Sequence, residues 1–170
     1  WGRPSWWANW EAEHRACREG VIVMDMSFMS KFRVHGRDAG AVLDRLSANA
    51  VDGESGQITY TQWLNERGLI EADLTVTKLG PEVGAPDGGF LVVATDTAQR
   101  HVGSLLQRAC EGAGHAFATE VTSALAMISV QGPQARAILA SLTTTDLSDE
   151  AFPFRAARSI DVGFARVLCI

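Results

Sequence analysis

Apolar residues recur with the helical spacing i, i+3, i+4, i+7 in three stretches of the chain. These stretches are Ala39–Leu46, Val102–Ala109 and Ala135–Leu142. Gly132-Pro133 opens the third and suits a first helical turn, and any residue of Thr95-Asp96-Thr97 is able to cap the second. A shorter helix is predicted near Trp10–Arg18, ending at Gly20.

Runs of strand length, bounded by turn signals, lie between these helices. The predicted strands are Gly20–Asp25, Met29–Val34, Gln57–Leu64, Leu69–Leu79, Phe90–Ala94, Leu125–Val130 and Ile160–Ile170. Asn65–Gly68 is predicted as a hairpin turn and Gly80–Gly89 as a surface loop. Helices separated by hairpins predict an α+β fold with a largely antiparallel sheet and flanking helices.

Composition and charge narrow the classes of function. The chain has 170 residues, enough for one domain with a core and part of a second. Its net charge of −5 argues against a nucleic-acid partner, which needs a basic face to displace phosphate counterions. No apolar run approaches the roughly 20 residues that cross a bilayer, so no membrane partner is expected. The three cysteines are isolated, which favours a reducing compartment, and we expect a cytoplasmic protein.

The two ends of the sequence predict a segment cut from a longer polypeptide. The chain opens on Trp1 and closes on the apolar run Val167–Ile170, which is typical of the middle of a buried strand. We interpret residues 1–20 as a lead-in segment that packs on a neighbouring domain, and residues 21–170 as the N-terminal part of a second domain. The packing residues would be Trp1, Trp6, Trp7 and Trp10.

The hairpin over residues 57–79 carries the most chemical information. Side chains alternate between the two faces of a strand, so its second strand has an apolar face and a polar face. The apolar face holds Ala72, Leu74 and Val76, and the polar face holds Glu71, Asp73, Thr75 and Thr77. A four-residue loop closed by Leu64 and Leu69 pairs Tyr60 with Asp73. A glycine bulge at Gly68 would instead pair Tyr60 with Leu74.

An aromatic ring beside a carboxylate is a suitable floor for a planar ligand rich in N–H groups, such as a pterin. The Tyr60 ring offers stacking area and the Asp73 carboxylate accepts hydrogen bonds. From the hairpin alone, the commoner explanation of a polar strand face is exposure to solvent.

Other chemical signals are weak. The histidines lack the spacing of a zinc site, so no metal is expected. Gly112-Ala-Gly114 lacks the third glycine and the preceding strand of a dinucleotide-binding motif. Cys17 is interpreted as a structural thiol on a helix.

Four motifs occur in the order of a known family. They are Asp25–Gly36, Tyr60, Leu64–Val76 and Val130–Pro133. The chain thereby resembles the glycine-cleavage T-protein (aminomethyltransferase) family, and within it the folate-binding domains of dimethylglycine and sarcosine dehydrogenases. Phe152–Phe154, Ile160–Gly163 and Ala165–Val167 are similar to the same subgroup.

The resemblance implies roles for five residues. The essential aspartate of the family falls on Asp73, near the folate nitrogens, and its pterin-side tyrosine on Tyr60. The methionine that packs on folate falls on Met29, and two further folate contacts fall on Thr75 and Thr95. The chain departs from the family at Ala72, where many members have a second aspartate, and at Phe28, where they have histidine. A later glutamate and arginine would lie beyond Ile170.

The function implied is that of a tetrahydrofolate-binding domain. It would capture a one-carbon unit from an oxidised N-methyl amino acid of the dimethylglycine or sarcosine type, forming 5,10-methylenetetrahydrofolate. The resemblance implies FAD in a missing N-terminal domain of the parent chain, on which the tryptophans would pack. The alternatives are a non-catalytic folate-binding module for regulation or assembly, and a flavin-free folate-dependent methyl- or aminomethyltransferase. Asp73 favours the catalytic hypothesis, because a module that only binds folate does not need the carboxylate.

Overall fold

The computed structural model describes residues 2–170. Its helices are α1 (Trp7–Glu19), α2 (Ala39–Leu46), α3 (Gln99–Glu111) and α4 (Ala135–Ala140), with short 3-10 helices η1 (Pro81–Val83), η2 (Asp96–Ala98) and η3 (Thr122–Ala124). The strands are β1 (Ile22–Asp25), β2 (Ser30–His35), β3 (Ile58–Leu64), β4 (Ile70–Lys78), β5 (Phe90–Ala94), β6 (Phe117–Glu120), β7 (Ile128–Gln131), β8 (Arg158–Val162) and β9 (Ala165–Cys169).

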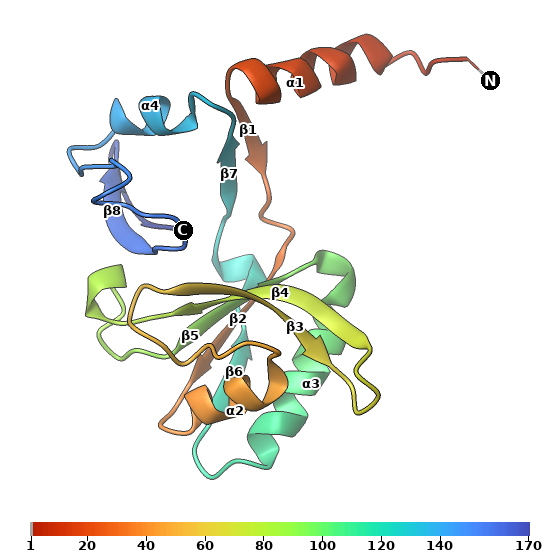
Figure 1. Cartoon of the computed structure of the whole chain (residues 1–170), viewed down its shortest axis with the longest axis vertical. Helices are drawn as coiled ribbons and strands as arrows, with labels where there is room; N and C mark the ends of the chain where they lie inside the picture. Colours follow the sequence, from red (N-terminus) through yellow and green to blue (C-terminus); the bar gives the residue numbers. More distant parts are fainter. Residues whose placement is uncertain (1) are drawn as a thin grey trace.

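A five-stranded sheet in the order β3-β4-β5-β2-β6 forms the body of the molecule (Figure 1). Every paired neighbour in it runs antiparallel, which confirms the predicted α+β fold. Helices α2 and α3 lie against one face, which we call the helix-covered face (Figure 1). Phe32, Val76 and Val92 from the strands pack there with Leu43 and Leu106 from the helices. This cluster is the main core.

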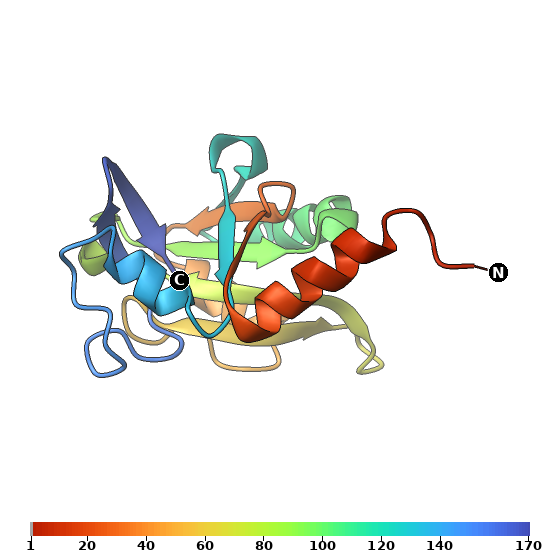
Figure 2. The ribbon, with the colours of Figure 1, turned by 90° about the horizontal axis from the view of Figure 1, so that it is seen from above.

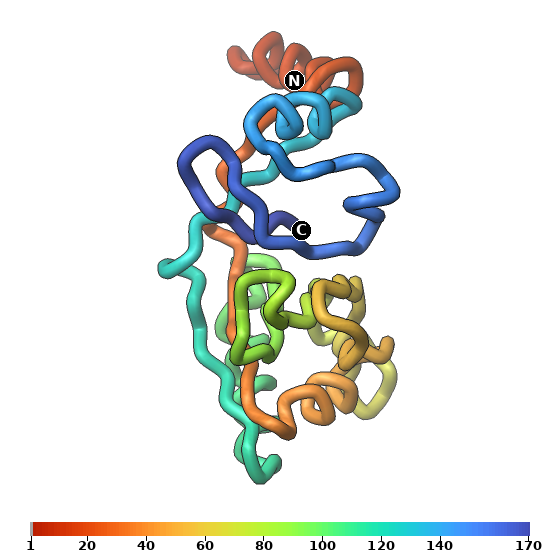
Figure 3. Tube along the Cα trace, turned by 90° about the vertical axis from the view of Figure 1, so that its left-hand side faces the viewer, coloured from red at the N-terminus to blue at the C-terminus, as the bar shows by residue number. Residues whose placement is uncertain are grey.

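Two smaller ribbons stand apart from this body. Strands β1 and β7 pair with each other and lead from the sheet to α1, whose N-terminal end points away from the molecule (Figures 1 and 2). Strands β8 and β9 form a separate hairpin. This C-terminal segment lies between α1 and the five-stranded sheet (Figure 3).

Several predicted boundaries were wrong. The predicted strand Ile160–Ile170 is part of a hairpin, because Gly163 adopts a positive φ of 57° and reverses the chain. Strand β7 begins at Ile128 because Leu125 ends η3, and α1 begins at Trp7. Strand β6 was not predicted, since it is a mostly exposed edge strand with little apolar alternation.

The predicted caps also differ from the structure. Thr95 is the N-cap of η2, Asp96 and Thr97 lie within η2, and Ala98 is the N-cap of α3. None of Thr95-Asp96-Thr97 therefore caps a helix through its side chain. Pro133 precedes α4, whose first residue is Ala135, rather than lying in its first turn.

The tryptophans of the lead-in segment leave much of their surface uncovered. Trp6 is 57% exposed and Trp10 is 45% exposed. Trp7 packs beside Trp10, with ring centroids 4.9 Å apart. Trp1 lies outside the described residues. The contact between this segment and a neighbouring domain stays a prediction.

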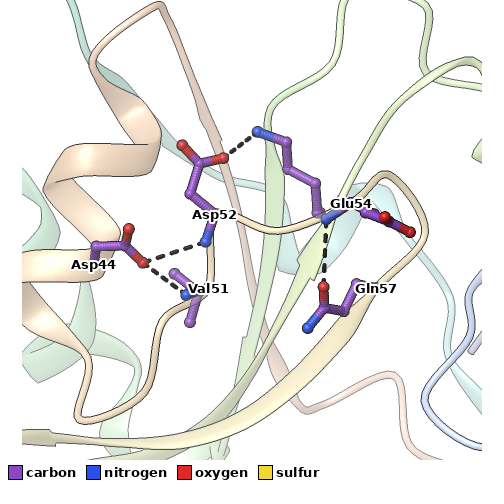
Figure 4. A network of polar contacts seen from close by, with 6 residues as sticks. Asp44, Val51, Asp52, Glu54 and Gln57 are labelled. Atoms are coloured by element: carbon purple, nitrogen blue, oxygen red, sulfur yellow. Dashed lines mark hydrogen bonds and ion pairs between the residues drawn. The ribbon is translucent and has the colours of Figure 1, made fainter.

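A polar network fixes the connection that leads into β3 (Figure 4). The Asp44 carboxylate on α2 accepts hydrogen bonds from the backbone N–H groups of Val51 (2.6 Å) and Asp52 (3.2 Å). Asp52 in turn forms an ion pair with Lys78 at the end of β4, over 2.5 Å. The network therefore ties α2, the loop before β3 and the end of β4 together.

No described helix is long and apolar enough to cross a bilayer.

Candidate functional site

The register of the β3–β4 hairpin differs from the predicted one by two residues. Tyr60 lies opposite Thr75, and Gln62 lies opposite Asp73. One residue of the shift arises at the turn, because Leu64 pairs with Ile70. The other arises at Glu71, which has no partner in β3, because the next pair is Trp63 with Ala72. Both predicted pairings of Tyr60, with Asp73 and with Leu74, were therefore wrong. The one-residue shift expected from a bulge at Gly68 is present at the turn, where Gly68 adopts a φ of 75°.

A shift of two residues keeps Tyr60, Asp73 and Thr75 on their predicted face. Ala72 and Leu74 are buried in the main core, and Asp73 is exposed on the opposite side of the sheet. Tyr60 lies on the same side as Asp73, and its phenol donates a hydrogen bond to Asp73 Oδ2 at 2.9 Å. The structure thus brings these two predicted site residues into direct contact.

Gln62 holds the second oxygen of Asp73. Its amide nitrogen donates to Asp73 Oδ1 at 3.1 Å, so β3 supplies a donor to each carboxylate oxygen. The bond to Asp73 raises the pKa of the Tyr60 phenol above its ordinary value, because it stabilises the protonated phenol. Gln62 counteracts part of this rise. Sequence reasoning missed Gln62, although its position two residues after Tyr60 places it on the same face.

The remaining predicted site residues lie along the same face of the sheet. Thr75 pairs with Val93 of β5, and Val93 pairs with Lys31 of β2. Thr95 and Met29 each lie one residue beyond the paired residues Ala94 and Ser30. By alternation, both continue the row that contains Gln62 and Asp73.

Met29 and Thr95 do not contact the Tyr60–Asp73 pair through any hydrogen bond among the described residues. Met29 packs against an apolar cluster that contains Val93 and Leu91. The Thr95 hydroxyl lies 3.4 Å from that of Thr97. Three inter-strand spacings separate β3 from β2, or about 14 Å. Tyr60 and Met29 would therefore contact different parts of an elongated ligand.

The face of the sheet that carries Asp73 lies opposite the helix-covered face. It is covered at one end and open at the other. Ala157 and Val83 pack over Leu91 at the covered end, where Thr77 is fully buried. Exposure then increases along β4 from Thr77 through Thr75 to Asp73, and Tyr60 is 53% exposed. The Thr77 hydroxyl has no hydrogen-bond partner among residues 2–170. The Asp73 end is thus accessible to a ligand.

Lys31 is a buried cation on the same face, and sequence reasoning missed it. Only 3% of Lys31 is exposed, and its ammonium donates to the carbonyls of Ser27 (2.9 Å) and Met29 (2.8 Å). Burial lowers the pKa of Lys31, while the nearby carboxylates of Glu120 and Asp25 act in the opposite direction. Lys31 therefore fixes the turn that carries Met29.

Glu71 does not accompany Asp73 as expected. At the bulge its carboxylate accepts a hydrogen bond from the Asn65 amide (2.8 Å) and lies 2.6 Å from His101 Nε2. His101 belongs to α3, which covers the other face of the sheet. The Asn65 bond, followed by that to His101, lowers the pKa of Glu71. Glu71 therefore links β4 to α3.

The site is an open face of the sheet. It presents the Asp73 carboxylate, the two side chains bonded to that carboxylate, and an apolar end at Met29. Two surface hollows of about 1000 and 540 Å³ lie elsewhere, one lined by Gly103 and Phe117 and the other by His115 and Gly88. The larger hollow also holds carboxylates and aromatic rings, those of Glu111, Glu120, Phe32 and Phe117. We place the site at Asp73 because there the carboxylate and an aromatic side chain are bonded directly to each other. Within residues 2–170 no group of His, Cys, Asp or Glu side chains is arranged to hold a metal ion.

Comparison with known proteins identifies a matching family and several relatives of this chain. Residues 1–170 match the family described as GCVT N-terminal domain. The chain is 36% identical over 162 residues to 4-methylaminobutanoate oxidase (formaldehyde-forming) of Paenarthrobacter nicotinovorans, covering 95% of this chain and 19% of that protein. It is 38% identical over 150 residues to mitochondrial sarcosine dehydrogenase of Homo sapiens, covering 82% of this chain and 16% of that protein. The chain thus spans less than a fifth of the length of these relatives.

A solved structure shares the fold. The glycine cleavage system aminomethyltransferase T from Bartonella henselae superposes with a TM-score of 0.70 and 26% sequence identity. The match covers 86% of this chain and 37% of that one.

Proposed function

The chain belongs to the GCVT N-terminal domain family, and on that premise we propose that it binds tetrahydrofolate on the open face of its sheet, beside Asp73. The observation that carries the proposal is the hydrogen bond between the Tyr60 phenol and Asp73 Oδ2 at 2.9 Å. It holds an aromatic ring and a carboxylate together on an accessible surface, with Gln62 on the other carboxylate oxygen.

The residues present fit a reduced folate. A tetrahydropterin carries several N–H donors around two fused rings, of which the pyrimidine ring is planar, and Asp73 is an acceptor held beside the ring of Tyr60. Thr75 lies directly opposite Tyr60 and adds a hydroxyl. Met29 offers an apolar contact about 14 Å away, which suits the aromatic part of the molecule beyond the pterin. Tyr60, Asp73, Thr75, Thr95 and Met29 are the residues that we assign to the ligand.

We propose that this site captures a one-carbon unit. Tetrahydrofolate supplies the two nitrogen atoms that bond the carbon of an oxidised N-methyl amino acid, an iminium, to give 5,10-methylenetetrahydrofolate. The transfer removes two N–H protons, of which the leaving amine takes one. Asp73 is the group that accepts the other, directly or through water, and it also orients the ligand.

The amine and its oxidation belong to the whole protein. We propose an N-methyl amino acid of the dimethylglycine or sarcosine type, oxidised by FAD held elsewhere in the parent chain. The relatives named as an oxidase and a dehydrogenase support this proposal. Gly112 ends α3 instead of opening a helix after a strand, so no dinucleotide-binding motif is formed there.

A second candidate is a flavin-free folate-dependent aminomethyltransferase, which the likeness to aminomethyltransferase T favours. The two candidates share the folate site and differ in the source of the carbon. A dinucleotide-binding glycine motif in the sequence that precedes Trp1 would support the flavin-dependent candidate.

Calorimetric titration of the full-length protein with tetrahydrofolate tests the site. We expect Asp73→Asn to weaken binding roughly 10- to 150-fold, the equivalent of a charge-assisted hydrogen bond of about 1.5–3 kcal/mol. Glu71→Gln is the matched control, because Glu71 is bonded to Asn65 and His101 instead. Equal affinities for all three proteins would exclude Asp73 from the folate site.

A further inference from the structure

The orientation of the Gln62 amide is fixed by the group that it faces. An ionised carboxylate has acceptor oxygens only, so the amide nitrogen of Gln62 must point toward Asp73. The carbonyl oxygen, Oε1, is then turned away from Asp73. No donor among the described residues bonds to this oxygen, and the side chain is only half-buried. Gln62 Oε1 is therefore presented as a free acceptor.

Tyr60 is oriented by the same carboxylate. Its hydroxyl hydrogen is used in the bond to Asp73 Oδ2, so only the lone pairs of the phenol oxygen remain for a ligand. A tyrosine phenol with its ordinary pKa of about 10 keeps this hydrogen at neutral pH, and the bond to Asp73 raises that pKa further. Asp73 thus takes up the phenol hydrogen of Tyr60 and one of the two amide hydrogens of Gln62, which leaves the phenol oxygen and Gln62 Oε1 as acceptors.

The result is a patch of the sheet in which three neighbouring groups accept hydrogen bonds. Its members are the Asp73 carboxylate, Gln62 Oε1 and the Tyr60 oxygen. A ligand that brings N–H donors satisfies these acceptors. A ligand that brings ring nitrogens with lone pairs places acceptor against acceptor and loses the water that satisfied both, which is unfavourable.

We propose that Gln62 is a specificity residue that makes the site select a reduced pterin over an oxidised one. The inference rests on the proposed function and goes beyond it. In a tetrahydropterin, N5 and N8 carry hydrogens, whereas in the fully oxidised ring the same nitrogens are acceptors. Gln62 Oε1 favours the reduced form because it rewards a donor and opposes an acceptor.

The test compares anaerobic calorimetric affinities of the full-length protein for tetrahydrofolate and folic acid. We expect Gln62→Met, which keeps the length and removes both polar atoms, to reduce the preference for tetrahydrofolate about tenfold. Gln107→Met is the matched control. The Gln107 amide also donates to a carboxylate, that of Glu111 at 3.1 Å, but both residues are on the exposed side of α3. This control should leave the preference unchanged.

A second variant reverses the polarity of the position. Gln62→Lys offers donors only, so the preference should shift further toward folic acid than in Gln62→Met. Circular dichroism and thermal unfolding confirm that each variant is folded. If the unaltered protein binds both ligands and neither variant changes the ratio of affinities, Gln62 does not set the specificity, while the folate site stands. If the unaltered protein binds neither ligand, the folate proposal fails, and this inference fails with it.

Discussion

The Tyr60 phenol donates a hydrogen bond to Asp73 Oδ2 at 2.9 Å, although the sheet pairs Tyr60 with Thr75. The contact is diagonal, a distance that an aromatic side chain is able to span on a strand face. Gln62, directly opposite Asp73, bonds the other oxygen. The carboxylate is therefore oriented by two residues of one neighbouring strand, and this arrangement defines the site.

Glu71 should make the stability of the fold sensitive to acid. Its folded pKa is lowered from 4.5, chiefly by the Asn65 amide and then by His101. A group with a lowered folded pKa stabilises the fold above its unfolded pKa, and that contribution is lost as pH falls through the folded value. Glu71→Gln should therefore lose less stability than the unaltered protein between neutral pH and about pH 3. Urea unfolding at both pH values measures the difference, and equal losses would contradict the assigned role.

The buried hydroxyl of Thr77 should lower the free energy of unfolding. It has no partner among residues 2–170, and Thr77→Val keeps the shape without the polar atom. We expect the free energy of unfolding to rise by about 1–3 kcal/mol. Thr61→Val is the control, because the equally buried Thr61 hydroxyl accepts from Asn49 N at 3.2 Å and its loss should destabilise. Destabilisation by Thr77→Val would mean that water or a ligand bonds this hydroxyl.

Lys31 should influence folate binding through Met29. Lys31→Met leaves the Ser27 and Met29 carbonyls without their ammonium donor and loosens the turn. We expect tetrahydrofolate affinity to fall about tenfold, or about 1.4 kcal/mol. Lys78→Met is the control, since Lys78 forms an ion pair with Asp52 at the covered end of the sheet. A loss of affinity that is the same in both variants would indicate general destabilisation instead.

The fold and the face of the site followed from local patterns in the sequence. The 3.6-residue period located the main helices, the two-residue alternation located β4, and a short apolar run located β5, because core packing imposes these patterns. The alternation of Ala72, Asp73 and Leu74 predicted which face Asp73 occupies, and this face survived an error of two residues in register.

The register and the supporting residues depended on distant contacts. The bulge at Glu71 accompanies a bond to His101, 30 residues later in the chain, which no local pattern reveals. Lys31 is buried with its ammonium donating hydrogen bonds to the carbonyls of the preceding turn, although a lysine in a short strand is ordinarily exposed. Gln62 alone carried a usable signal, its spacing of two residues from Tyr60.

The central claim is that Asp73 acts on folate during transfer of the one-carbon unit. The most direct measurement is the partition of product between formaldehyde and 5,10-methylenetetrahydrofolate in the full-length protein, with tetrahydrofolate and the N-methyl amine present. Asp73→Asn keeps the shape but removes the charge and the ability to accept a proton. We expect the rate of methylenetetrahydrofolate formation to fall about 10²–10⁴-fold while amine oxidation continues and releases formaldehyde. Glu71→Gln should leave the partition almost unchanged. An unchanged partition in Asp73→Asn would contradict the claim and leave Asp73 as an ordinary surface acid.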